Sequence, residues 1–283
     1  MKEFTGKTAV ITGGASGIGR AMGELFLDKG MNVVLADVEQ AALEATVATL
    51  GERGSEGACI GVVTDVTSAE QVQALADAAL EAFGSIDVAC NNAGVFTGGL
   101  LWEETLADYE WVMDVNVWGV IHGIRTFVPI MKAQACECHI VNTASMAAVT
   151  AMPYSGIYHM SKHAVLALSE SLYHELSFHA PNVGISVLCP EAINTGIAAS
   201  ERNRSGDYGD IKASDERDMV MGALADSVAG GIGPEVMAQR VFDAMVEGRF
   251  YILSDETWRN SANIRLDDIR EGRNPTFAPP ITE

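Results

Sequence analysis

The sequence is short of basic side chains. Its 283 residues include 18 lysines and arginines against 38 aspartates and glutamates, which gives a formal net charge of −20. A protein of this charge is repelled by nucleic acid and by anionic membrane surfaces, so we expect neither as a partner. Runs of 18 or more apolar residues are also lacking, and the amino-terminal segment has no signal-peptide pattern. We therefore predict a cytoplasmic protein without a transmembrane helix.

Cysteine is scarce as well. There are five cysteines, and an odd number argues against a disulfide framework. Three of them lie in apolar runs and are expected to pack as small buried hydrophobes. The other two, Cys136 and Cys138, stand beside His139, but the spacing is not C-x-x-C and no second pair of ligands follows. We predict no metal site.

Apolar segments of strand length alternate with longer helical segments along the chain. The expected strands begin near residues 7, 32, 59, 86, 139, 184 and 250, and the clearest helices cover residues 18–29, 39–50 and 69–83. Ser68 and Gln71 are typical of a capping box at the start of the third helix. Several strands are nearly all apolar, as parallel strands covered on both faces should be. The pattern predicts an α/β fold: a Rossmann-type, doubly wound domain with about seven parallel strands and helices on both faces.

No repeat or linker divides residues 1–283, which we interpret as a single domain. Residues 198–222 are polar and lack a strand pattern, so we expect a segment at about 196–230 to form a substrate lid, or else a surface excursion. Pro234 suits the first position of a further helix. A tail with three prolines, from about residue 272, is expected to be extended.

The first strand ends in the sequence TGGASGIG, and a helical pattern follows it directly. Such a turn lets backbone N–H groups approach a pyrophosphate, although tight turns also need glycine for other reasons. The second strand ends at Asp37, 18 residues after Gly19 (37 − 19). A carboxylate there can accept hydrogen bonds from the adenosine ribose and would repel a 2′-phosphate. The paired signals predict NAD rather than NADP; the alternative is that Asp37 is an ordinary turn residue.

The sequence YHMSK places Tyr158 and Lys162 four residues apart, which puts them on one face of a helix. A phenol has a pKa of about 10, and an adjacent ammonium favours its anion. The two residues could therefore form a general acid/base, or else be an ordinary packed or surface pair.

With TGGASGIG, NNAG and YHMSK in this order, the chain resembles the short-chain dehydrogenase/reductase family, most closely over residues 5 to about 200. The resemblance implies a catalytic tetrad of Asn116, Ser145, Tyr158 and Lys162. It also implies a cofactor site made of Gly13, Ser16, Gly17, Ile18, Gly19, Asp37, Asp65, Val66, Asn92, Ala93, Gly94, Tyr158, Lys162, Pro190, Ile193 and Thr195. One position departs from the family pattern. Glu191 stands where glycine usually follows the proline, and its carboxylate could bond a substrate, cap the loop or face solvent.

These residue types suit hydride transfer between a secondary alcohol and a nicotinamide. Tyr158 could take the hydroxyl proton as general base or return it as general acid, while Lys162 stabilises the phenolate and holds the nicotinamide ribose. Ser145 could bind the substrate oxygen, and Asn116 could fix a water that links Lys162 to solvent. The expected substrate contacts are Phe96, Ser145, Met146, Met152, Tyr154, Glu191 and Ile197.

Because these walls are mostly apolar and the lid carries Met219 and Met221, we expect a medium-sized apolar substrate, aromatic or alicyclic. The prediction is an NAD-dependent short-chain alcohol dehydrogenase or ketone reductase. The alternatives are a ketone reductase that uses both NAD and NADP, and a non-catalytic dinucleotide-sensing protein on the same fold. The resemblance further implies a homotetramer, or a dimer, packed through helices near residues 103–133 and 153–180.

Overall fold

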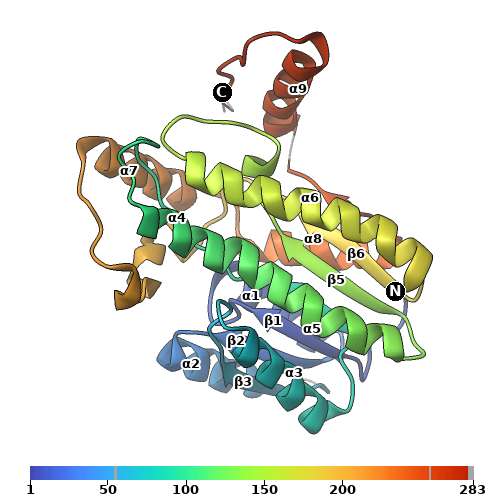
Figure 1. Ribbon diagram of the computed structural model, residues 1–283. Coiled ribbons are helices and arrows are strands. Elements are labelled where there is room, and N and C mark those ends of the chain that lie inside the picture. The colour runs from blue at the N-terminus through green and yellow to red at the C-terminus, as the bar shows by residue number, and fades with distance from the viewer. Residues whose placement is uncertain (54–55, 255, 280–283) are drawn as a thin grey trace.

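The computed structural model describes residues 1–53, 56–254 and 256–279, and a parallel sheet forms its centre (Figure 1). The described strands are β1 (Thr8–Thr12), β2 (Asn32–Asp37), β3 (Cys59–Val63), β4 (Val88–Asn91), β5 (Cys138–Thr143), β6 (Val183–Leu188) and β7 (Tyr251–Ile252). They form a seven-stranded sheet in the order β3-β2-β1-β4-β5-β6-β7, and every pairing is parallel. The predicted fold class is confirmed.

Helices connect the strands and cover both faces of the sheet. The longer ones are α1 (Gly17–Asp28), α2 (Gln40–Gly51), α3 (Ala69–Phe83), α4 (Leu106–Met113), α5 (Gly119–Ala133), α6 (Gly156–His179), α7 (Asp215–Ala229), α8 (Pro234–Glu247) and α9 (Glu256–Glu271). Short helical turns are η1 (Asp114–Trp118), η2 (Met146–Ala148), η3 (Gly196–Asn203) and η4 (Gly206–Tyr208). As expected, Pro234 begins α8, where its missing N–H costs no hydrogen bond.

The core lies in two layers because successive strand residues point to opposite faces. Ile11 of β1 packs in one cluster with Phe26 of α1, together with residues of α2 and α8. Its neighbour Val10 packs in a second cluster with Phe127 of α5, together with residues of α3 and α6. The all-apolar strands of the sequence are thus explained by burial on both faces.

Two local details differ from the sequence pattern. Ser68 accepts the N–H of Gln71 at 3.2 Å, but the Gln71 side chain turns to the preceding loop and accepts the N–H of Asp65 at 2.8 Å, so the capping box is only half formed. Helix α9, which no pattern indicated, lies apart from the sheet (Figure 1). Residues 272–279 form neither helix nor strand, and the end of the expected extended tail, residues 280–283, lies outside the described residues.

The topology places a crevice at the carboxyl edge of the sheet. The chain leaves β1 toward β2 on one side and reaches β4 on the other, and ligands of open α/β sheets bind where the strand order reverses in this way. No helix in the described part of the chain has both the length and the hydropathy needed to span a bilayer.

Candidate active site

The glycine turn between β1 and α1 is shaped for close backbone approach. Gly13 and Gly17 have φ angles of +65° and +52°, in the left-handed region that residues with a Cβ rarely adopt. A Cβ at Gly19 would overlap the carbonyl oxygen of Gly13. The residues of the turn that line the cleft are Gly13, Ser16, Gly17 and Ile18. Gly19 does not line it, and instead allows the first turn of α1 to pack against the backbone of Gly13.

Asp37 ends β2 at the wall of the same cleft. One carboxylate oxygen accepts the N–H of Ala15 at 3.0 Å, and the other accepts the N–H of Glu39 at 3.1 Å. A carboxylate can accept about four hydrogen bonds, so this geometry leaves acceptor positions that a ligand can use. Asp37 therefore shapes the turn, as the alternative interpretation held, and can also bind ribose hydroxyls.

Side-chain hydrogen bonds join the carboxyl ends of three strands. The backbone N–H and the side-chain amide of Asn92 donate to Oγ1 and the carbonyl oxygen of Thr12, at 2.9 and 3.0 Å. The Thr143 hydroxyl donates to Asn92 Oδ1 at 3.2 Å. The expected cofactor residues after β3 and after β4 all line the cleft: Asp65, Val66, Asn92, Ala93 and Gly94. A Cβ at Gly94 would lie 3.3 Å from Lys162 Nζ, so this loop also touches the lysine.

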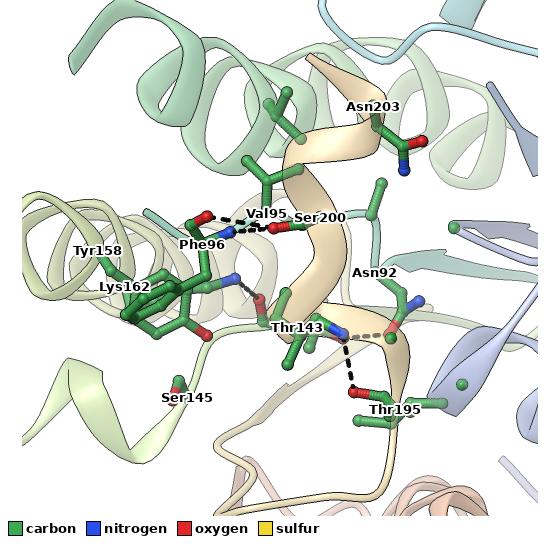
Figure 2. Close-up of a pocket in the computed structure, with 18 of the residues that line it drawn as sticks. Asn92, Val95, Phe96, Thr143, Ser145, Tyr158, Lys162, Thr195, Ser200 and Asn203 are labelled. Atoms are coloured by element: carbon green, nitrogen blue, oxygen red, sulfur yellow. Dashed lines mark hydrogen bonds between the residues drawn. The ribbon is translucent and has the colours of Figure 1, made fainter. Parts of the chain in front are cut away.

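Tyr158 and Lys162 lie one turn apart on α6 and line the same cleft (Figure 2). Lys162 is buried, and its Nζ donates to the carbonyl oxygen of Thr143 at 3.1 Å. This Nζ lies 5.5 Å from the centre of the Tyr158 ring. The other face of the site is formed by Phe96, whose ring centroid lies 5.0 Å from that of Tyr158. The end of β5 thus holds the ammonium beside the phenol.

Burial controls the ionisation of both groups. It raises the pKa of Tyr158 to about 12, while a hydrogen bond with Ser145 acts in the opposite direction. Burial also lowers the pKa of Lys162 to about 8. Burial, rather than the charge of Lys162, therefore dominates the pKa of Tyr158. Both groups are desolvated, and Lys162 donates to Thr143 rather than to the phenol oxygen.

Ser145 and Asn116 support this pair from two sides. Ser145 follows β5 and lines the cleft, and its Oγ accepts the N–H of Ala147 at 3.1 Å and donates to the carbonyl oxygen of Pro190 at 3.5 Å. Asn116 lies in the π-helical turn η1 and is buried behind the cleft wall, which it does not line. Its Oδ1 accepts the N–H of Val95 at 2.8 Å, and its amide donates to the Val95 carbonyl and to Ser161 Oγ at 2.9 and 3.0 Å. Asn116 thus joins the loop after β4 to α6.

The loop after β6 forms another wall. The expected cofactor residues Pro190, Ile193 and Thr195 line the cleft there. Thr195 Oγ1 accepts the N–H of Ile197 and begins η3. Glu191 also lines the cleft, but Arg240 of α8 donates to both of its carboxylate oxygens, at 3.1 and 3.3 Å. This ion pair, which the sequence did not indicate, compensates the negative charge of Glu191.

Five of the seven expected substrate contacts line the cleft: Phe96, Ser145, Met152, Glu191 and Ile197. Met146 and Tyr154 do not. Met146 begins η2 and is buried in the hydrophobic core with residues of α5, α6 and β6, so its side chain supports the wall from behind. Tyr154, in the loop before α6, has a φ of 63°, and its backbone carbonyl accepts the N–H of Gly99 in the loop before α4.

The two methionines expected from the lid do not reach the cleft. Met219 is 53% exposed, and neither it nor Met221 lines the cleft. Residues of the lid and other helices that the sequence did not single out line it instead: Trp111, His159, Ser200, Arg202, Asn203, Tyr208, Leu224, Val228 and Trp258. They are brought to the cleft by packing, and the polar character of residues 198–222 was the only signal that pointed to some of them.

A second group of polar side chains lies at the amino edge of the sheet, away from the cleft. The sulfurs of Cys136 and Cys138 and a carboxylate oxygen of Asp87 lie within 4.8 Å of one another. His139, which is adjacent to Cys138 in the sequence, is not part of this group. Its Nε2 lies 2.9 Å from Ser186 Oγ. The Lys7 ammonium donates to Asp87 at 2.8 Å. A cation thus already neutralises the only carboxylate of this group, so the geometry does not favour a metal ion.

The cleft therefore combines a glycine turn in the left-handed region, an acidic residue at the end of β2 and a tyrosine–lysine pair. The family model of the short chain dehydrogenases matches residues 7–206. The chain belongs to the short-chain dehydrogenase/reductase family, and it is an oxidoreductase that uses a nicotinamide dinucleotide.

Known proteins resemble the chain over most of its length. A 1-deoxy-11-beta-hydroxypentalenate dehydrogenase of Streptomyces exfoliatus is 36% identical over 282 residues, covering 98% of this chain and 92% of that protein. A 2,5-dichloro-2,5-cyclohexadiene-1,4-diol dehydrogenase of Sphingobium indicum is 37% identical over 196 residues, covering 69% and 76%. The crystal structure of a short chain dehydrogenase/reductase from Burkholderia phymatum in complex with NAD has a TM-score of 0.96 and 47% identity, and covers 100% of both chains.

Proposed function

We propose that this protein is an NAD-dependent oxidoreductase that interconverts a secondary alcohol and a ketone, with Tyr158 as the general acid/base. The observation that carries the proposal is the meeting of Ser145, Tyr158 and Lys162 in one cleft with the glycine turn. Each of these residues, taken alone, could have a purely structural role. Purely structural roles do not explain why a buried lysine and a tyrosine both line the same cleft as the glycine turn.

Each side chain has a defined task in this proposal. The bound cofactor would accept a hydride from the alcohol carbon or return it to the ketone. Ser145 donates a hydrogen bond to the substrate oxygen, and Tyr158 gives or takes the proton of that oxygen. Lys162 holds the ribose next to the nicotinamide. Asn116 positions the loop after β4 against α6, and a water held near it would complete the proton path to solvent.

The pKa values of Tyr158 and Lys162 affect whether the site favours ketone reduction or alcohol oxidation. With a pKa of about 12, the Tyr158 hydroxyl is protonated at neutral pH, which is the form that donates a proton during ketone reduction. Alcohol oxidation needs the phenolate, so its rate should rise with pH. Lys162, with a pKa of about 8, is mostly charged at neutral pH, and its charge favours the phenolate once a proton has left.

The preference for NAD over NADP rests on Asp37. Its carboxylate faces the cleft at the end of β2, where it would repel a 2′-phosphate and accept hydrogen bonds from ribose hydroxyls. The similar Burkholderia phymatum protein was solved in complex with NAD, which supports this choice. The competing possibility, a reductase of dual cofactor use, would require another cation to compensate the 2′-phosphate.

The substrate we propose is a medium-sized apolar molecule with an aromatic or alicyclic group. The described cleft has apolar walls that include Phe96, Trp111, Met152, Ile197 and Trp258. Glu191, which also lines the cleft, is paired with Arg240, so neither provides a free charge for an ionic substrate. The name of the similar Sphingobium indicum protein, a cyclohexadiene-diol dehydrogenase, also favours an alicyclic alcohol.

The test is a panel of neutral and charged secondary alcohols and ketones, assayed by reduced-nicotinamide absorbance with NAD and NADP. We expect turnover of apolar cyclic substrates with NAD. Tyr158→Phe should lower kcat by about 10²- to 10⁴-fold while NADH affinity is kept. Tyr173→Phe is the matched control, because Tyr173 lies on the same helix but is exposed at the surface. Full turnover by Tyr158→Phe would show that the base is another residue; NADH binding without turnover by any variant would favour a sensing protein.

Three broader predictions stay proposals. We propose one domain in which residues 196–230 serve as the lid, located in the cytoplasm. We also propose a homotetramer, or failing that a dimer, formed through α4, α5 and α6. The large apolar side chains of Leu106, Trp118, Met160 and Phe178 are exposed on these helices or their ends, which supports self-association, and light scattering would measure it.

A further inference from the structure

Helix η3 crosses the cleft from one wall to the other, and we call it the strap. It runs from Gly196, next to Thr195 at the end of the loop after β6, to Asn203 (Figure 2). Its residues Gly196, Ile197, Ser200, Arg202 and Asn203 line the cleft. Two fastenings hold the strap at opposite walls of the cleft, and they differ in burial and in charge. In addition, Glu201 of the strap forms an ion pair with Arg217 of α7.

The first fastening lies beside the catalytic tyrosine. Ser200 is buried, and its hydroxyl accepts the backbone N–H of Phe96 at 2.9 Å and donates to the carbonyl oxygen of Phe96 at 3.2 Å. The Phe96 ring packs on that of Tyr158. Because both polar groups of Phe96 are bonded away from water, opening this point would leave buried donors and acceptors unpaired, which is costly.

The second fastening lies at the opposite wall, beyond Asp37. Arg202 donates to both carboxylate oxygens of Glu39, with Nη2 at 2.7 Å and Nε at 3.1 and 3.2 Å. The Asn203 amide donates to the same carboxylate at 3.1 Å. Glu39 follows Asp37 by two residues, and these contacts lower the pKa of its carboxyl group. Arg202 and Glu39 are 163 residues apart in the sequence, so only the fold joins them.

We propose that Glu39 and Arg202 are positioning residues that clasp the strap over the adenosine end of the cofactor cleft and so control cofactor release. This inference rests on the proposed NAD site. A dinucleotide that extends from Asp37 to Tyr158 has to pass beneath the strap, so it can leave only when one fastening opens. The clasp is the weaker of the two, because its side chains are 40% and 31% exposed and such ion pairs contribute little. The strap therefore opens from the adenosine end and turns about Ser200.

The experiment measures the dissociation rate of NADH by stopped-flow fluorescence, with excess NAD as the competitor. Glu39→Ala removes the clasp but keeps the hydrogen bonds that Arg202 donates to the carbonyls of Gly196 and Ala199. We expect it to raise the dissociation rate about two- to fivefold. Arg202→Ala should have at least this effect, and the double variant should add little to it. Arg53→Ala is the control, since Arg53 forms an ion pair of similar exposure with Asp28, which does not line the cleft.

The dependence of the NADH dissociation rate on ionic strength distinguishes the clasp from a purely structural role of Glu39. Added salt screens an exposed ion pair, so NADH release from the wild type should quicken as salt rises, whereas Glu39→Ala should release NADH at a rate that hardly depends on salt. If Glu39→Ala released NADH at the wild-type rate, with the wild-type salt dependence and an unchanged Tm, the proposed role of the clasp would be refuted. The proposed NAD site would still stand. Failure of the wild type to bind NADH would instead overturn the proposed function and, with it, this inference.

Discussion

The strongest test of the lid is to break the ion pair between Arg204 and Asp108, for which we propose Arg204→Met. The pair is 2.6 Å long, and the two side chains are only 4% and 1% exposed. Arg204 also donates to the carbonyl oxygens of Tyr208 and Gly209, and its guanidinium lies 5.4 Å from the ring centre of Trp111, which lines the cleft. One side chain thus joins the lid to α4.

The magnitude follows from what the substitution leaves behind. Asp108 still accepts the N–H and the hydroxyl of Thr105, but its charge becomes buried without a cation. Breaking a buried pair in this way costs about 3–5 kcal/mol. In a protein of this size each kcal/mol lowers Tm by roughly 2–4 °C, so we expect Tm to fall by roughly 6–20 °C.

The dependence on pH identifies the cause. In the wild type, hydrogen bonds from Thr105 and the Arg204 guanidinium hold the pKa of Asp108 below its usual value against the opposing effect of burial. Its contribution to stability is therefore present above the unfolded-state pKa and is lost as pH falls through the folded-state pKa. In Arg204→Met, burial should prevail and raise this pKa, so Asp108 takes up a proton more easily. The difference in stability between variant and wild type should then shrink from pH 7 toward pH 5.

The assay is urea unfolding at pH 7 and pH 5, together with hydrogen exchange of residues 196–210. Arg249→Met is the control, because Arg249 pairs with Glu247 at the surface, with side chains 45% and 58% exposed, and should change stability by less than about 1 kcal/mol. We expect faster exchange in the lid of Arg204→Met. A loss below about 1 kcal/mol at pH 7, or a loss that does not depend on pH, would refute the reasoning.

Two further predictions concern the cofactor and acid stability. Asp37→Ser should raise the ratio of kcat/KM with NADP to that with NAD at least about tenfold, because it removes a charge that repels the 2′-phosphate; an unchanged ratio would show that Asp37 only shapes the glycine turn. Burial lowers the pKa of His139 to about 3, so the unfolded state binds an extra proton below about pH 6.5. As pH falls from 6 to 4, the titration of His139 should lower the free energy of unfolding by up to about 1.4 kcal/mol per pH unit. Urea unfolding of His139→Gln should show a smaller dependence on pH. An equal pH dependence in both proteins would show that another group titrates.

Much of the fold and part of the site could be predicted because they depend on local rules. Alternation of apolar strands and helices implies a parallel, doubly wound sheet, and the carboxyl ends of parallel strands meet at one edge. That edge receives the glycine turn, Asp37 and Asn92, whose positions follow directly from the ends of their strands. Tyr158 and Lys162 share a helical face because they are four residues apart.

Predictions that depended on the surroundings of a side chain fared worse. Met146 is adjacent to Ser145 in the sequence, yet it packs in the core, because the η2 turn sends the two side chains in different directions. Glu191 is held by Arg240, 49 residues away, and nothing near it in the sequence indicated this partner. The pKa of Tyr158 is raised because the fold buries it, a property that spacing along a helix does not carry.

The sequence by itself determined the order of strands and helices, the glycine turn and the tyrosine–lysine spacing, since each arises from residues close together in the chain. Only the tertiary structure decided how deeply the phenol and the ammonium are buried, which lid residues reach the cleft, and that Glu39 meets Arg202 across it. These properties depend on desolvation and on contacts between distant segments, and both come into being only when the layers pack.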